Sequence, residues 1–409
     1  MASGTGAGYS ASTRQDQSTA TAATLPSAAQ PVYVLRGHRS AIHSLTFLRH
    51  NSRLLSGDAD GWAVLWTLAS KRPAAVWKAH EGAVLGLVRW GDERVISQGR
   101  DGKVIVWQLK SDHEAGLDKR LPVDDADADQ KNPWILHSIK VETVNFCALA
   151  VCSELEVRPN QSEDGGLLMA VPAAKDNQID VFQLPTEHHL STVPAVQGTK
   201  TGMVMAIRIF HHQNSLLLAA GYENGCLAVF QQNSGNAVWL QRSTTRFHTQ
   251  PLLSIDVAPN IGMVFSSAAD AIIASYPIVQ SDTQSAREFK TKHSGQQGLA
   301  VRPDDKILAT AGWDARVRVY STKTLKELAV LKWHKEGCYA VAFAPIQQPV
   351  ENISEDTEKS YTDSHRDIEQ RADSSVFQTV EQRRHAKVSA THWLAAGSKD
   401  GKISLWDIY

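Results

Sequence analysis

The chain has 409 residues, of which 42% are apolar and 21% are charged. This composition supplies ample material for a core and predicts about two or three globular domains, or one large repeat array. Lys and Arg total 42 while Asp and Glu total 43, so the net charge argues against a protein built to coat nucleic acid or an anionic membrane.

The four cysteines form no Cys-x-x-Cys pair, which argues against a disulfide scaffold and predicts a reducing compartment. No apolar run is long enough to cross a bilayer, and the N-terminal residues contain no apolar signal core. We therefore expect neither a membrane segment nor secretion. Residues 1–29 are rich in Ala, Ser and Thr and predict a disordered tail, while residues 30–409 are expected to form one folded unit.

A repeated spacing organises the chain after this tail: a His, then a Ser or Thr, then an Asp at a turn, then an aromatic residue six positions after the Asp. The His and the Asp are 21 or 22 residues apart in four copies. The predicted sets, in chain order, are His38, Ser56, Asp60 and Trp66; His80, Ser97, Asp101 and Trp107; His248, Ser266, Asp270 and Tyr276; His293, Thr310, Asp314 and Tyr320; and His334, Asp400 and Trp406. We expect each set to form a buried hydrogen-bonded network that rigidifies a small sheet.

Two weaker copies lie between the second and third sets and end in Phe182 and Phe230, which brings the count to seven. Residues between the markers alternate apolar and polar side chains, and Asp-Gly pairs mark tight turns, as in four-stranded antiparallel blades. The sequence thus predicts an all-β, seven-bladed β-propeller. The chain ends on a third strand, so the strand near residues 31–35 is expected to complete the last blade and to close the ring.

Three segments interrupt the repeat. They are an acidic loop at 110–131, a polar insert at 153–166 and an acidic insert at about 347–388. The last is rich in Asp and Glu and poor in aromatic residues, which predicts disorder.

The sequence nominates no catalytic, cofactor-binding or metal-binding residue. It contains no phosphate-binding loop and no nucleophile elbow. The adjacent histidines His188-His189 and His211-His212 would point to opposite faces of a strand, which makes each pair a poor chelate. An Asp–His pair that recurs in blade after blade indicates a structural role. We therefore expect a protein that is not an enzyme and that binds no small-molecule substrate, no nucleic acid directly and no membrane.

The repeat resembles the WD40 β-propeller over roughly residues 31–409, with its Gly-His and Trp-Asp markers. Within it, residues 144–149 (VNFCAL), 202–208 (GMVMAIR) and 217–225 (LLAAGYENG) resemble the ASTRA-associated protein 1 family. That family is similar to the guanine nucleotide-binding protein β-subunit-like protein 1 group.

The resemblance implies a non-enzymatic scaffold subunit of the ASTRA complex. It further implies links to chromatin remodelling and to the maturation of phosphatidylinositol-3-kinase-related kinases. The implied partners are a co-chaperone of the Tel2-Tti type, a large kinase-related subunit and AAA+ helicases. The implied location is the nucleus, with the cytoplasm also open.

An alternative is a substrate receptor of a cullin-RING ubiquitin ligase, because residues 313–316 read Trp-Asp-Ala-Arg. The repeat count places this box at a turn before a strand, whereas the adaptor-binding box follows the terminal Trp. For partner contacts the sequence nominates Arg100, Tyr222 and Trp313, which lie at the turns and are of the residue types that dominate interfaces. Packing of Trp313 against a neighbouring blade is the competing interpretation.

Overall fold

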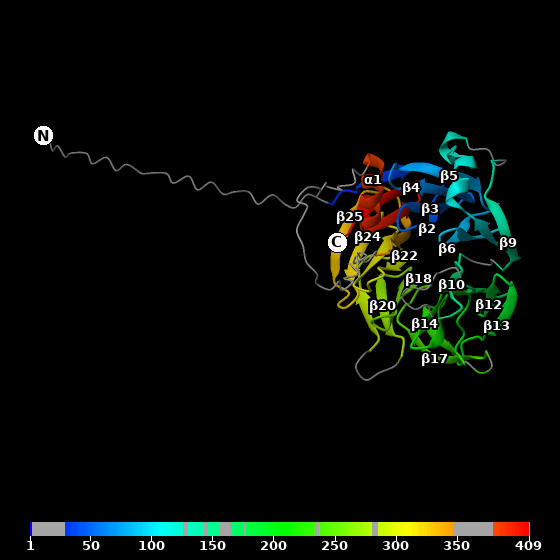
Figure 1. Cartoon of the computed structure of the whole chain (residues 1–409). Helices are drawn as coiled ribbons and strands as arrows, with labels where there is room; N and C mark the ends of the chain where they lie inside the picture. Colours follow the sequence, from blue (N-terminus) through cyan, green and yellow to red (C-terminus); the bar gives the residue numbers. More distant parts are fainter. Residues whose placement is uncertain are drawn as a thin grey trace, which may run out of the picture.

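The computed structural model describes residues 1, 29–125, 130–142, 146–155, 165–175, 177–233, 235, 237–279, 285–346 and 379–408. The predicted N-terminal tail lies almost entirely outside these residues, as do most of the polar insert and the first part of the acidic insert. The described part forms seven four-stranded antiparallel sheets arranged as blades around a ring, in chain order (Figure 1). The predicted seven-bladed propeller is confirmed.

The first four blades are each built from consecutive strands. Blade 1 contains β2 (Ile42–Leu48), β3 (Arg53–Asp58), β4 (Trp62–Thr67) and β5 (Arg72–Lys78); blade 2 contains β6 (Val84–Trp90), β7 (Arg94–Gly99), β8 (Lys103–Gln108) and β9 (Trp134–Lys140); blade 3 contains β10 (Ala150–Ser153), β11 (Leu167–Pro172), β12 (Ile179–Leu184) and β13 (His188–Val193); blade 4 contains β14 (Val204–His212), β15 (Ser215–Tyr222), β16 (Cys226–Gln232) and β17 (Trp239–Arg246).

The next two blades repeat this order, and the last differs in the source of its outer strand. Blade 5 contains β18 (Leu252–Ala258), β19 (Met263–Ala268), β20 (Ile272–Pro277) and β21 (Arg287–Lys290); blade 6 contains β22 (Gln296–Val301), β23 (Ile307–Gly312), β24 (Arg316–Ser321) and β25 (Glu327–Lys332); blade 7 contains β26 (Cys338–Phe343), β27 (Trp393–Ser398), β28 (Lys402–Asp407) and β1 (Tyr33–Arg36).

The ring closes through β1. Tyr33 pairs with Leu405 and Arg36 with Lys402 in an antiparallel register, and the N–H of Val32 donates to the carbonyl of Leu405 at 2.8 Å. The N-terminal strand therefore completes the last blade, as predicted. Closure removes two open sheet edges that would otherwise be free to pair with other chains.

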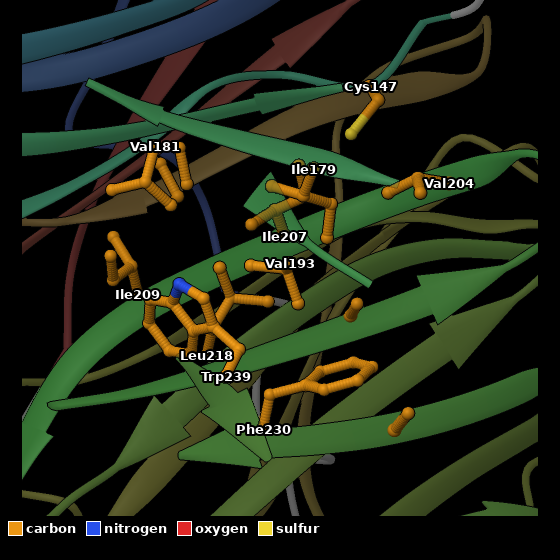
Figure 2. Packing of buried hydrophobic residues seen from close by; sticks show 14 of the residues in the cluster. Cys147, Ile179, Val181, Val193, Val204, Ile207, Ile209, Leu218, Phe230 and Trp239 are labelled. Atoms are coloured by element: carbon orange, nitrogen blue, oxygen red, sulfur yellow. The ribbon is translucent and has the colours of Figure 1, made fainter. Parts of the chain in front are cut away.

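The apolar core consists of seven clusters, and each joins two neighbouring blades. Figure 2 shows the cluster between blades 3 and 4, where Phe230 and Trp239 pack with Leu218. Phe230 is fully buried. Since these two blades lack the His–Ser–Asp set, packing against their neighbours replaces the polar network there.

Two predicted interruptions contain ordered structure. The loop at 110–131 includes two short 3-10 helices, η1 (Ser111–Gly116) and η2 (Pro122–Asp124). From η1, the buried carboxylate of Glu114 forms ion pairs with Arg49 and Arg53 of blade 1. The loop is thus a strap fixed across blade 1.

The prediction of disorder as far as residue 388 was wrong at its C-terminal end, where α1 (Val380–Ala390) forms. A capping box begins this helix, because Thr379 and Gln382 exchange hydrogen bonds between side chain and backbone. Val388 is buried, and its carbonyl accepts a 2.9 Å hydrogen bond from the indole of Trp393. Composition alone missed this anchor, because acidic residues dominate the preceding segment.

Candidate functional site: the rim of the central channel

Three blades contain the hydrogen-bonded set in which a His bridges an Asp and a Ser. In blade 2, His80 lies 3.0 Å from Asp101 through Nδ1 and 2.7 Å from the Ser97 hydroxyl through Nε2. The indole of Trp107 donates to the same hydroxyl at 2.8 Å. Blade 5 repeats this arrangement with its four predicted residues, His248, Ser266, Asp270 and Tyr276.

These networks fix the turn between the two middle strands of a blade. Burial by itself would raise the pKa of Asp101, but hydrogen bonds from His80 and from the backbone of Glu81 and Lys103 outweigh it and hold this pKa below its usual value. Asp270 has a lowered pKa for the same reasons. Each carboxylate is therefore ionised, and it ties the connection that enters a blade to a turn inside it.

Blade 1 differs from the prediction in its carboxylate. His38 Nδ1 lies 2.6 Å from Asp58, not Asp60, while Nε2 lies 2.8 Å from Ser56, which also accepts from Trp66 at 2.9 Å. Asp58 occupies the position of Gly99 in blade 2, where an added Cβ would lie 2.3 Å from the His80 ring. A side chain there points straight at the histidine, so Asp58 displaces Asp60, which is exposed at the turn.

Blade 6 departs further from its predicted set. Asp314 is held by Arg318 at 2.6 and 3.1 Å, and His293 lies 3.8 Å away with 43% of its side chain exposed. Thr310 donates to Gln296 at 2.5 Å, and the buried hydroxyl of Tyr320 has no hydrogen-bond partner in the described part of the chain. The prediction for this blade was wrong because Arg318 donates to Asp314 in the place that the spacing had assigned to His293.

Blade 7 keeps His334 and Trp406 in its network but takes its hydroxyl from another strand. Its predicted Asp400 lies 3.7 Å from His334 Nδ1, beyond hydrogen-bond distance, and accepts from Lys402 at 3.0 Å instead. The position of Ser56 in blade 1 is filled by Ala396, and its directly paired residue on β28 is Ser404. Ser404 lies 2.8 Å from His334 Nε2 and accepts from the Trp406 indole at 2.9 Å. The sequence pattern expected the hydroxyl on the second strand of each blade, and it therefore missed Ser404 on the third strand.

The face that carries these turns also carries the mouth of the central channel, a cavity of about 370 Å3 lined by the inner strands of all seven blades. In six blades a β-bulge falls at the second residue of the inner strand. A bulge re-aims one side chain, and all six bulged residues line the cavity: His43, Leu85, Met205, Leu253, Gln297 and Tyr339.

Sequence reasoning missed this ring, although a signal was present. Four of its members lie five positions after the repeat histidine, for example His43 after His38 and Tyr339 after His334. Burial is the larger influence on the pKa of His43 and lowers it, while the Asp58 carboxylate acts in the opposite direction. A neutral imidazole at the channel mouth follows from this balance.

Aromatic side chains continue from this ring onto the surface. His43 stacks on Phe146 with ring centroids 6.4 Å apart and contacts Tyr339 at 5.8 Å. The Arg100 guanidinium lies 4.6 Å above Phe146, which is 53% exposed. We call the aromatic side chains of His43, Phe146, Tyr339 and Trp313, together with the adjoining Arg100, the aromatic arc. It offers stacking and cation–π surfaces that bind protein side chains well.

The three nominated contacts have different outcomes. Trp313 is 47% exposed at the turn between β23 and β24, and Arg100 is also exposed. The prediction for Tyr222 was wrong, because its side chain is fully buried between blades 3 and 4. Tyr222 is the last residue of β15, and the alternation of the strand points it into the apolar cluster.

Within the described ranges, no group of histidine, cysteine or acidic side chains could hold a metal ion, and no helix is long and apolar enough to span a bilayer. The buried thiols of Cys147 and Cys338 have pKa values that burial raises to about 12. Such thiols are protonated and unreactive.

The chain is similar to known proteins along most of its length. A sequence model of the family described as ASTRA-associated protein 1 matches residues 31–406. A protein named ASTRA-associated protein 1 from Penicillium rubens is 44% identical, over 94% of this chain and 98% of its own length. Proteins of the same name from Verticillium alfalfae and Schizosaccharomyces pombe are 44% and 31% identical, over 96% and 80% of this chain and 96% of their own lengths in both cases.

Proposed function

The chain belongs to the ASTRA-associated protein 1 family, and from this membership we propose that it is a non-enzymatic, protein-binding subunit of the ASTRA complex. The observation that carries the proposal is the rim of the channel. Seven blades converge on a surface of exposed aromatic and basic side chains, and the buried networks hold its turns in fixed positions. A rigid surface of this kind binds a partner at a small cost in conformational entropy.

At a finer level, the proposed partners are a co-chaperone of the Tel2-Tti type, a large kinase-related subunit and AAA+ helicases. Through them the protein would take part in the maturation of phosphatidylinositol-3-kinase-related kinases and in chromatin remodelling, acting in the nucleus. These assignments rest on what the family name implies for its members. The rim supports them by supplying a binding surface, while the described residues nominate no catalytic group.

The test is purification of the tagged full-length protein from its own cells at near-physiological salt, followed by mass spectrometry of the retained proteins. Recovery of the co-chaperone, the kinase-related subunit or the helicases supports the proposal. Recovery of a cullin adaptor instead would replace it with the ubiquitin-ligase alternative. In the structure, the Trp-Asp-Ala-Arg box spans the turn from β23 to β24, and its Asp314 is already bound by Arg318.

A further inference from the structure

The rim over blades 6 and 7 combines an exposed tryptophan with a local excess of positive charge. Trp313 lies over Gly295, where an added Cβ would be 2.2 Å from the indole ring. The indole N–H donates to Gln297 at 2.9 Å, which links it to the ring of bulged residues. The indole of Trp313 is thus held in place, while nearly half of the surface of this residue remains open to solvent.

Five cations lie near this tryptophan on the rim, in the connections that enter blades 6 and 7, at their turns and at a strand end, and none forms an ion pair with another described residue. They are Lys292, Arg316, Lys332, Lys335 and Lys399. Their proximity follows from the backbone. Arg316 pairs directly with Lys332 across β24 and β25. The N–H of Lys399 donates to the carbonyl of Gly337, and an added Cβ on Gly337 would lie 3.2 Å from the Trp313 carbonyl oxygen.

Most carboxylates of this sector are already neutralised. Asp314 is bound by Arg318, and Asp400 accepts a 3.0 Å hydrogen bond from Lys402. On the rim face of blades 6 and 7, described residues 291–295, 313–315, 333–337 and 399–401 include one carboxylate without an ion pair to a described residue, that of Glu336. Five cations against one carboxylate create a positive potential around Trp313, although the whole chain has a net charge of −1.

We propose that this surface, the blade 6–7 rim, binds an extended acidic peptide segment of a partner protein. An apolar side chain of the segment would pack on Trp313, while flanking carboxylates would pair with the surrounding lysines and Arg316. Clustered cations around one aromatic anchor complement such a segment in both charge and shape. The proposal rests on the proposed function, since it names the chemistry by which the subunit would recognise a partner.

A peptide fits this surface better than nucleic acid. Across the channel, exposed lysines such as Lys175 and Lys200 alternate along the rim with the exposed carboxylates of Glu81, Glu142 and Glu223, so the local excess of positive charge lies on blades 6 and 7. A long polyanion that followed the rim would meet these carboxylates, whereas a short acidic segment would not. Binding of nucleic acid at this site therefore becomes one outcome that would overturn the proposal.

The direct test uses the full-length protein and fluorescence anisotropy. The probe is a short fluorescein-labelled peptide in which glutamates flank a central phenylalanine, and the reference peptide carries glutamine in place of glutamate. We expect the glutamate peptide to bind and its affinity to fall as salt rises. Trp313→Ala should weaken binding about thirtyfold, and the double change Lys335→Glu with Lys399→Glu about tenfold.

The matched control is Lys175→Glu with Lys200→Glu, which reverses two exposed lysines at the same face in blades 3 and 4. It should leave the affinity within about twofold of wild type. Equal binding of the glutamine peptide, equal losses in both double variants, or tighter binding of single-stranded DNA that Trp313→Ala also abolishes would each overturn the proposal. Thermal unfolding of every variant verifies that it is folded.

A second experiment separates this inference from the proposed function. A photo-cross-linking residue, p-benzoylphenylalanine, replaces Lys399 in the tagged protein, and the complex is irradiated in native cells before purification. We expect the cross-linked partner peptide to be rich in Asp and Glu. If the ASTRA subunits are recovered but the cross-linked segment is neutral or basic, the inference fails while the proposed function stands. If none of those subunits is recovered, the proposed function fails.

Discussion

The hydroxyl of blade 7 permits a sharp test of the network, because it has moved to the paired position on the adjacent strand. Ser404→Ala would remove the acceptor of the Trp406 indole N–H and the hydrogen-bond partner of His334 Nε2. Both groups are buried. His334 Nδ1 already has no hydrogen-bond partner in the described structure, since Asp400 lies 3.7 Å away. The imidazole would then be held by no hydrogen bond.

The expected cost follows from the groups left unpaired. Each buried polar group without a partner costs roughly 1–3 kcal/mol, so two of them predict a loss of about 3 kcal/mol in the free energy of unfolding. Urea unfolding followed by tryptophan fluorescence measures this value. Ser56→Ala in blade 1 is the matched control. It removes a hydroxyl that bonds the equivalent His38 and Trp66 of blade 1, and it should lower the free energy of unfolding by a similar amount.

The decisive variant is a rescue. Ala396→Ser, added to Ser404→Ala, returns the hydroxyl to the position that Ser56 occupies in blade 1, because Ala396 and Ser404 are paired residues. We expect recovery of more than about half of the lost stability. A Ser404→Ala variant as stable as wild type would refute the importance of the network. A full loss with no rescue would refute the equivalence of the two strand positions.

Three further results are expected. Replacing Glu114 by Ala leaves the cations of Arg49 and Arg53 without their buried partner, so the free energy of unfolding should fall by about 3 kcal/mol in urea titrations. Burial lowers the pKa of His43 below 6.5, so the unfolded chain binds more protons and stability should decline as the pH falls through 6.5. His43→Phe should flatten this decline in thermal scans. Deleting residues 405–409 should open the ring and yield aggregates in size-exclusion chromatography.

Controls make these three outcomes specific. Asp112→Ala removes a carboxylate from the same 3-10 helix, 75% exposed, and should change stability by less than about 0.5 kcal/mol. An unaltered pH profile in His43→Phe would contradict the role given to that imidazole. A folded monomer after deletion of residues 405–409 would show that the C-terminal end of β28 is dispensable for closure.

The sequence by itself determined the number of blades, the position of the closing strand and the complete polar networks of blades 2 and 5. These features depend on local periodicity and on fixed offsets from a turn, so residues near in the chain specify them. His80, Ser97, Asp101 and Trp107 form their predicted network because every member lies at a regular strand position.

Only the tertiary structure decided which side chains meet across strands and blades. Asp58 reaches His38 before Asp60, Ser404 substitutes for an absent hydroxyl at Ala396, and Arg318 takes the place of His293. In each case the residue that forms the hydrogen bond lies a few positions away or on the neighbouring strand. A fixed spacing along the sequence does not show which of these residues reaches its partner.

The tertiary structure also determines which side chains form the binding surface at the rim. The bulged residues converge on the channel only when seven blades close into a ring, and Tyr222 is buried only because blade 3 packs against it. Exposure at the rim is a property of the closed ring, because each turn is covered or left open by its neighbours. The residue pattern within one blade therefore does not predict which of its rim side chains the next blade will bury.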